Sequence, residues 1–251
     1  MSKISAIVIT LNEENNIAAC LESLRWVDEI VVMDSGSHDR TREIARTFTT
    51  MIFETRWQGY GETKNVALNK TNGDWILWVD ADERVTPQLA KDIRNRLEVD
   101  GGRYSGYEMA RLAFFLKRPL RHGGWYPGYV LRLFKREAGR FSVPAVHEGV
   151  VLKGSRSRLK GDLLHDTDPT LEHYLKKMNH YTTLAADELC KKGIKAGLFD
   201  LLLRPQVMFF KMFFLKAGYR DGIPGFLVAL LSAFHVLTKY AKLWERRGKK
   251  S

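Results

Sequence analysis

Several common signals of function are missing from this sequence of 251 residues. Its two cysteines, Cys20 and Cys190, lie far apart inside helix-like patterns, so we expect neither a disulfide framework nor a zinc knuckle. There is no Gly-x-x-x-x-Gly-Lys-Ser/Thr loop, and no Gly-x-Gly-x-x-Gly follows the first strand-like run, which removes the motifs of P-loop and dinucleotide-binding proteins. No basic and apolar leader precedes Ile4. We therefore expect the chain to act in the cytoplasm.

The sequence also lacks a long apolar run. The longest stretch, residues 223–238, contains Pro224 and His235 and is shorter than the roughly 20 residues that a membrane-spanning helix needs. We therefore predict that this segment lies on a membrane and does not cross it.

Positive charge is concentrated at one end of the chain. Residues 1–188 contain 27 Lys and Arg against 26 Asp and Glu, whereas residues 189–251 contain 13 against 3, so these parts carry +1 and +10 of the net charge of +11. The basic part is rich in Phe, Leu and Met, which favours an anionic membrane surface as its partner. Alternatively, residues 189–251 form a helical lid whose apolar face covers the core and whose lysines are solvated. Nucleic-acid binding would require basic residues on the nearly neutral part as well, so we expect no nucleic acid.

Strand and helix patterns alternate in the first third of the chain. The predicted strands span residues 4–10, 29–33, 51–54 and 75–79. This order is typical of βαβ units, so the predicted fold class is α/β, with a mainly parallel central sheet flanked by helices. After residue 102 the strand-like segments follow one another without crossover helices and predict a mixed or antiparallel extension of the sheet.

Helix starts and the domain boundary can also be predicted. Asn12 is the expected cap of a helix that begins at Glu13, and Thr86 caps a helix with Pro87 at its first position. From Thr170 onward the sequence is helical again. We therefore predict a catalytic domain over residues 1–168 and a basic, amphipathic helical extension over residues 169–251.

Polar side chains follow three of the predicted strands. Thr10 and Glu13 come after the first strand, Asp34 after the second, and Asp80 and Asp82 after the fourth. Ligands of open α/β sheets bind beyond the carboxyl ends of the strands. The alternative interpretation is that the acids are surface charge, and that in the same segments Gly36 is a turn residue and the helix caps are Asn12, Ser37 and Asp39. The convergence of the polar side chains on one edge of the sheet favours a binding site.

The two aspartates after the fourth strand indicate a metal. An extended backbone would point Asp80 and Asp82 to the same side. Mg²⁺ or Mn²⁺ prefers carboxylate oxygens and is commonly completed by substrate phosphates, so the pair predicts a site for a nucleotide diphosphate.

At this point the sequence resembles the inverting glycosyltransferases of family 2, which have the GT-A fold. The resemblance covers residues 4–168 and rests on motifs in a fixed order. These are Ile7-Val-Ile-Thr-Leu-Asn-Glu-Glu14, Val32-Met-Asp-Ser-Gly-Ser-His-Asp-Arg-Thr41, Lys64-Asn65 and Asp80-Ala-Asp-Glu83.

The resemblance implies roles for these residues. It implies that Thr10, Glu13 and Asp34 bind the nucleoside, that Asp80 reaches the ribose or metal region, and that Asp82 binds the metal on the diphosphate. Lys64 and Asn65 would lie near the base or the phosphates.

Later segments are similar to the lipopolysaccharide core β-glucosyltransferase subgroup: Gly124-Trp-Tyr-Pro127, Arg132-Leu-Phe134 and Val146-His-Glu-Gly149. Inversion at an anomeric carbon needs an acceptor hydroxyl that is deprotonated opposite the leaving nucleotide, and Glu148 is the expected base. His147 either binds the metal or orients the base. Arg132 would assist at the diphosphate, and His165 is a second candidate metal ligand. Asp166 and Asp168 are the alternative bases.

Together these features predict a metal-dependent, inverting hexosyltransferase. The resemblance implies that it moves glucose from UDP-glucose to a lipid-linked saccharide, the inner-core heptose of lipopolysaccharide, and we expect it to act as a peripheral protein on the inner face of the cell membrane. The Gln-x-x-Arg-Trp string of processive synthases is absent, since Gln206 is followed by Val-Met-Phe, so a single addition is expected. The alternatives are another donor or acceptor, such as a glycolipid or a protein, and a non-catalytic, basic membrane- or nucleic-acid-binding protein on the same fold.

Overall fold

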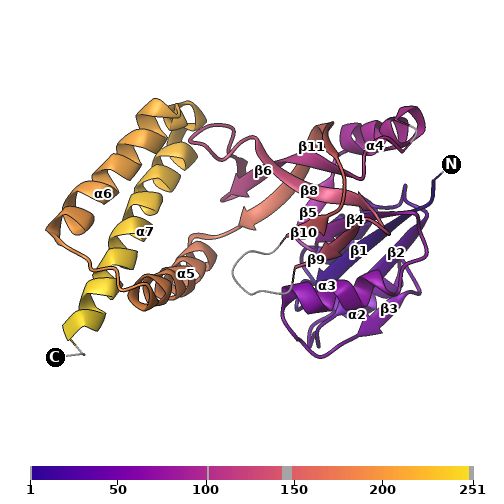
Figure 1. Ribbon diagram of the computed structural model, residues 1–251, viewed down its shortest axis with the longest axis horizontal. Helices are drawn as coiled ribbons and strands as arrows, with labels where there is room; N and C mark the ends of the chain where they lie inside the picture. The colour runs from indigo at the N-terminus through magenta and orange to yellow at the C-terminus, as the bar shows by residue number, and fades with distance from the viewer. Residues whose placement is uncertain (1, 101, 143–148, 249–251) are drawn as a thin grey trace. The chain divides into compact units, whose positions relative to one another are not determined.

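The computed structural model describes residues 2–100, 102–142 and 149–248, which divide into two units (Figure 1). The first unit comprises the chain up to Arg111 together with Tyr129–His165. The second comprises Leu112–Gly128 and the residues from Asp166 onward. The second unit therefore contains, besides the expected helical extension, a segment from the middle of the chain.

Four parallel strands form one half of the main sheet. Their order is β3-β2-β1-β4, and Figure 1 shows α2 and α3 beside them. The strands are β1 (Ile4–Thr10), β2 (Glu29–Asp34), β3 (Ile52–Glu54) and β4 (Trp75–Asp80), and the connecting helices are α1 (Ile17–Glu22), α2 (Thr41–Arg46) and α3 (Tyr60–Leu68). The predicted βαβ organisation is confirmed.

The other half of the sheet is not a continuation of this parallel pattern. β8 pairs antiparallel with β4, and the order continues through β6 and β11 to β5. β7 pairs with β6, while β9 and β10 form a separate two-stranded sheet. The bounds are β5 (Glu83–Val85), β6 (Gly106–Phe115), β7 (Arg118–Pro119), β8 (Gly128–Lys135), β9 (Gly139–Phe141), β10 (Val150–Leu152) and β11 (Arg156–Asp168). The mixed extension predicted after residue 102 is confirmed, and the α/β fold class with it.

The central strands are buried on both faces. Along β1 and β4, Ile7 and Ile76 pack with Ala67 of α3, whereas their neighbours Val8 and Leu77 belong to the cluster that includes α1 and α4 (Pro87–Val99). Because helices cover both faces, these strands read as continuous apolar runs and show no polar alternation.

The first helix begins later than its sequence pattern predicts. Asn12 has a φ of 56° and does not cap a helix; its side-chain Oδ1 accepts a hydrogen bond from the backbone N of His38 at 2.9 Å. The backbone N of Glu13 donates to Thr41 Oγ1 at 2.7 Å, so residues after β1 are tied to the loop that follows β2. The helix therefore begins only at Ile17. The predicted cap of α4 is correct, since Thr86 Oγ1 accepts from Leu89 N at 3.2 Å.

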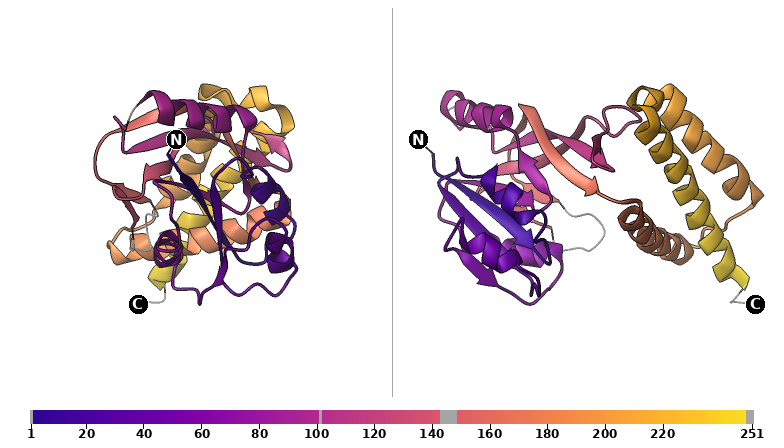
Figure 2. Two further views of the ribbon diagram at one scale, coloured as in Figure 1. Left: turned by 90° about the vertical axis from the view of Figure 1, so that its right-hand side faces the viewer. Right: turned by 180° about the vertical axis from the view of Figure 1, so that it is seen from behind.

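The second unit is built around a helical hairpin. Helix α6 (Leu198–Phe210) continues as the π-helical turn η1 (Lys211–Leu215), and a short 3-10 helix η2 (Gly218–Asp221) leads into α7 (Gly222–Gly248). Figure 2 shows α6 and α7 side by side from behind. Helix α5 (Leu171–Lys191) packs on α7. Lys242 Nζ of α7 donates hydrogen bonds to Asn179 O and Thr182 Oγ1 of α5, at 2.7 and 2.8 Å.

The prediction that the apolar segment 223–238 is too short for a membrane-spanning helix is wrong. This segment lies within one continuous helix, α7, of 27 residues. Pro224 does not shorten it, because it stands in the first helical turn, where a missing backbone N–H costs nothing. Among the described residues, the helical segment Gly218–Arg246 is long and apolar enough to cross a membrane by length and composition.

A glycine in β11 gives a test of the packing between β11 and α4. Gly161 has a φ of +91°, and a Cβ there would lie 2.7 Å from the backbone N of Leu89. Gly36 has a similar φ of +98° but open space around it, so Gly36→Ala carries backbone strain alone, about 1 to 2 kcal/mol. We expect Gly161→Ala to lower the free energy of unfolding, measured in urea, by about 2 kcal/mol more than Gly36→Ala. Equal losses would contradict the close approach of β11 and α4.

Candidate active site

The polar residues after β1, β2 and β4 meet at one edge of the sheet. The parallel register pairs Thr10 with Asp34 and Ile9 with Asp80. The three carboxyl ends therefore lie side by side, as the sequence predicts. The hydroxyl of Thr10 is buried there, and it has no hydrogen-bond partner among the described residues.

Asp34 organises the loop that follows β2. Its fully buried carboxylate accepts hydrogen bonds from the backbone N of Gly36 at 3.1 Å and of Ser37 at 2.9 Å. Ser37 Oγ in turn accepts from Asn12 N at 2.9 Å, and Glu13 accepts from Asn16 Nδ2 at 2.8 Å. Asp34 and Glu13 thus occupy the same edge, in two loops that are bonded to each other.

A buried arginine forms the centre of the charged cluster. Arg132 on β8 is 2% exposed, and its Nη2 donates to Asp80 Oδ2 at 2.8 Å and to Glu83 Oε1 at 2.5 Å. Glu83 Oε2 also accepts from the backbone N of Asp80 at 3.1 Å. The Nε and Nη1 atoms of Arg132 have no hydrogen-bond partner in the described part of the chain. The β4–β5 turn is therefore held from both ends by one guanidinium.

Two cations lie over the same indole ring. The guanidinium of Arg132 is 3.4 Å and Lys64 Nζ is 4.0 Å from the ring centroid of Trp78. Lys64 Nζ also lies 3.6 Å from Asp80 Oδ1, and Trp78 Nε1 donates to Leu131 O at 2.9 Å, which fixes the indole. The aromatic face stabilises both positive charges in a site largely closed to water.

This environment shifts the pKa values of Asp80 and Glu83 in opposite directions. Burial opposes the charge on Asp80, but Arg132 and Lys64 outweigh it and lower its pKa from 3.8 to about 2. Burial raises the pKa of Glu83, and the charge of Arg132 offsets only part of that increase. Asp80 is therefore anionic throughout the physiological pH range.

The two aspartates of the Asp-x-Asp string have different partners. β4 ends at Asp80, and Ala81 and Asp82 form a turn, so the expectation that an extended strand aligns both carboxylates is wrong. Asp82 Oδ2 lies 3.1 Å from Nε2 of His165 on β11, a residue whose register places it opposite Glu83. The site brings together Asp82 and His165, the two predicted metal ligands.

This pair fits a divalent cation that substrate oxygens complete. A carboxylate oxygen and an imidazole nitrogen are both ligands of Mn²⁺, and Mg²⁺ is commonly held by one or two carboxylates plus phosphate oxygens. Within residues 2–100, 102–142 and 149–248, no group of three or more His, Cys, Asp or Glu side chains could hold a metal alone. The protein would thus supply two ligands and leave the remaining positions to a substrate.

The remaining predicted site residues are Asn65, His147 and Glu148. The side chain of Asn65 donates to Phe141 O and accepts from Phe141 N, both at 3.0 Å, and so anchors β9 to α3. His147 and Glu148 lie outside the described residues.

Sequence reasoning assigned no role to Glu83 or Trp78. One signal for Trp78 was available, since it stands two residues before Asp80 and therefore on the same face of β4.

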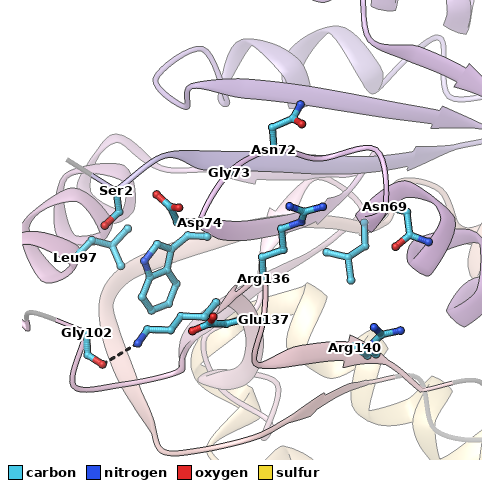
Figure 3. Close-up of a pocket in the computed structure, with 13 residues that line it drawn as sticks. Ser2, Asn69, Asn72, Gly73, Asp74, Leu97, Gly102, Arg136, Glu137 and Arg140 are labelled. Carbon is cyan, nitrogen blue, oxygen red and sulfur yellow. Dashed lines mark hydrogen bonds between the residues drawn. The ribbon is translucent and has the colours of Figure 1, made fainter.

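A separate cavity lies away from this edge. A hollow of about 740 Å³ lies beside Trp75, the first residue of β4, at the opposite end of the strand from Asp80 (Figure 3). Asp74, Arg136 and Glu137 are among the residues that line it (Figure 3), and Lys135 Nζ donates a hydrogen bond to Gly102 O at 2.9 Å. This cavity is therefore distinct from the charged cluster around Asp80 and Arg132.

Known proteins are similar to this chain over most of its length. The profile of Glycosyl transferase family 2 matches residues 5–136. The lipopolysaccharide core biosynthesis glycosyltransferase LpsC of Rhizobium meliloti is 31% identical, over 99% of this chain and 94% of the relative. An uncharacterized glycosyltransferase of Rickettsia typhi is 29% identical, over 98% of this chain and 88% of the relative.

A solved structure with the same fold is the mannosyltransferase PcManGT from Pyrobaculum calidifontis, in complex with GDP-Man and Mn²⁺. Its TM-score is 0.56 at 16% identity, over 96% of this chain and 87% of that one. The expected GT-A fold is confirmed.

The charged cluster predicts a large effect of losing its arginine. Arg132→Met would leave the buried carboxylate of Glu83 without its nearest cation and Asp80 with Lys64 alone, so we expect the free energy of unfolding to fall by about 3 to 5 kcal/mol. Arg118→Met, at an exposed arginine, is the matched control and should change it by less than about 0.5 kcal/mol. Urea unfolding followed by tryptophan fluorescence measures both. Equal stability of the two variants would contradict the central role of Arg132.

Proposed function

Since the chain belongs to glycosyl transferase family 2, we propose that it transfers one glucose residue from UDP-glucose to a lipid-linked saccharide with inversion at the anomeric carbon. The observation that carries this proposal is the cluster at the carboxyl ends of β1, β2 and β4. There, a constantly ionised Asp80, two buried cations and the Asp82–His165 pair occupy one edge. A nucleoside diphosphate offers hydroxyls and phosphate oxygens that suit such a set.

The donor would be held by several residues of this edge. Thr10, Glu13 and Asp34 would bind the nucleoside, and the Asp80 carboxylate would accept a hydrogen bond from a ribose hydroxyl. Lys64 and Arg132 would place positive charge beside the diphosphate.

Asp82 and His165 would hold Mg²⁺ or Mn²⁺. The bound cation would neutralise charge on the departing diphosphate. A fold shared with a mannosyltransferase that binds GDP-Man and Mn²⁺ is compatible with this assignment.

The chemical step requires a base on the acceptor side. We assign this role to Glu148, with His147 as its orienting neighbour, on the resemblance to family 2 enzymes. The Glu148 carboxylate takes the proton of the acceptor hydroxyl, whose oxygen forms a bond to the anomeric carbon. The bond from that carbon to the diphosphate oxygen breaks on the opposite face, and its electron pair leaves with UDP.

The acceptor we propose is the inner-core heptose of lipopolysaccharide. Its support is the similarity to LpsC over the whole chain. Such an acceptor is anchored in a membrane, so the enzyme would act from the cytoplasm as a peripheral protein on the inner leaflet. The basic extension over residues 169–251 would contact that anionic surface.

Metal-assisted donor binding is the first test. Calorimetric titration with UDP should show uptake that depends on Mn²⁺, and Asp82→Asn should weaken it by at least about tenfold. Asp74→Asn, which removes a carboxylate at the opposite end of β4, should leave it unchanged. Binding of UDP that ignores Mn²⁺ would remove the metal from the proposal.

Turnover tests the base and the donor. With UDP-glucose and heptose-terminated lipopolysaccharide, Glu148→Gln should lower kcat by about 10² to 10⁴ and keep donor affinity, whereas Glu137→Gln should retain activity. Normal turnover by the first variant would move the base to Asp166 or Asp168. A panel of other sugar nucleotides, with glycolipid and protein acceptors, identifies a different substrate if UDP-glucose is inert.

A further inference from the structure

Much of the helical hairpin's surface is apolar and exposed. On α6 and η1, large side chains are exposed at helical spacing, namely Phe199, Leu203, Val207, Phe210 and Phe214. On α7 the same spacing holds for Ile223, Phe226, Leu230, Phe234 and Trp244. We call these ten residues the hairpin face. Gln206 interrupts it on α6. Soluble proteins rarely expose connected apolar patches larger than a few hundred Å².

Aromatic contacts join the two halves of the hairpin face. The ring of Phe213 lies 5.7 Å from that of Phe226 across the hairpin and 5.1 Å from that of Phe214. Phe210 lies 5.1 Å from Phe214 in turn. Near the turn, the exposed residues of α6, η1 and α7 therefore belong to one connected surface.

Positive charges outnumber negative ones around the hairpin face. Lys211, Lys216 and Arg220 are exposed at the turn between the helices. Of the three acids in residues 189–251, Asp200 is paired with Arg204 and Asp221 with His122. An anionic leaflet complements this pattern, whereas a second copy of the chain would bring two strongly basic regions together.

We propose that the hairpin face is inserted into an anionic phospholipid leaflet, with α6 and α7 lying in the plane of the membrane. The inference rests on the membrane location in the proposed function and specifies the face, the depth and the orientation. The aromatic and aliphatic side chains enter the acyl region to about 5 to 10 Å, and the cations of the turn stay among the headgroups.

The packing of α7 opposes a spanning orientation. Val228 and Ala229 pack with Tyr174 and Met178 of α5, and Lys242 is bonded to the same helix. Crossing the bilayer would carry α5, with the exposed charges of residues such as Lys176, into hydrocarbon. Among the described residues, the exposed apolar side chains of α7 lie on the side that does not pack on α5. A helix that lies in the plane of the membrane can insert that side alone.

Vesicle binding tests the face with an identical substitution at two sites. Val207→Glu lies on the hairpin face, and Val99→Glu changes another exposed valine, at the end of α4. On vesicles of phosphatidylcholine with phosphatidylglycerol, we expect Val207→Glu to lower binding about tenfold or more and Val99→Glu to leave it unchanged. Binding to pure phosphatidylcholine should be weaker, and added salt should weaken binding to the anionic vesicles. Equal binding by both variants overturns the proposal.

Catalysis is measured separately so that the two proposals can fail independently. Turnover of UDP-glucose with a detergent-solubilised acceptor should be the same for wild type and Val207→Glu. Loss of turnover in every variant with vesicle binding intact would refute the proposed function alone. Absence of vesicle binding together with a dimeric mass in solution, abolished by Val207→Glu, would assign the face to a second copy and overturn the insertion.

Orientation is read from a fluorophore on single cysteines in a Cys190→Ser background, in which the remaining Cys20 is buried. A label at Phe210→Cys should shift to the blue and be quenched by lipids with spin labels in their acyl chains, while a label at Arg204→Cys should not. Labels at Tyr219→Cys and Glu245→Cys, near the two ends of α7, should both be reduced by external dithionite. Protection of one end would show a spanning helix and overturn the in-plane arrangement.

Discussion

The buried guanidinium of Arg132 is the constraint on which the functional edge depends. It joins the antiparallel half of the sheet, through β8, to both ends of the β4–β5 turn. The register that sets Leu77 opposite Leu133 brings the next residues, Trp78 and Arg132, together, so strand pairing itself delivers the cation to the acids. A charge buried in this way is stable only while its carboxylates remain, which makes the position of Asp80 a property of the fold.

The sequence predicts those parts of the fold that local patterns determine. The parallel strands are apolar throughout because helices cover both faces, and the Thr86-Pro87 cap is a local hydrogen bond. It does not predict interactions between distant segments. The start of α1 is moved by bonds from the loop after β2, and the contact of Arg132 with Glu83 depends on a strand order that no local pattern reveals.

The candidate site follows the same division. Thr10, Asp34 and Asp80 were predictable because the ends of adjacent parallel strands meet at one edge. The different partners of Asp80 and Asp82 were not, because a turn after β4 replaces the extended backbone that the spacing suggested. In the helical extension, the amphipathic pattern was visible, but residues 223–238 were counted alone, whereas the helix α7 continues beyond them to Gly248.

The paired hydrogen bonds of Asn65 have a mechanical consequence. They tie α3, which carries Lys64, to the two-stranded sheet of β9 and β10, and the chain between these strands contains His147 and Glu148. In the proposed function, a shift of Lys64 toward an arriving diphosphate would therefore be transmitted through α3 to β9. The side-chain amide of Asn65 thus couples the position of α3 to that of β9, so that neither element can shift alone without breaking two hydrogen bonds.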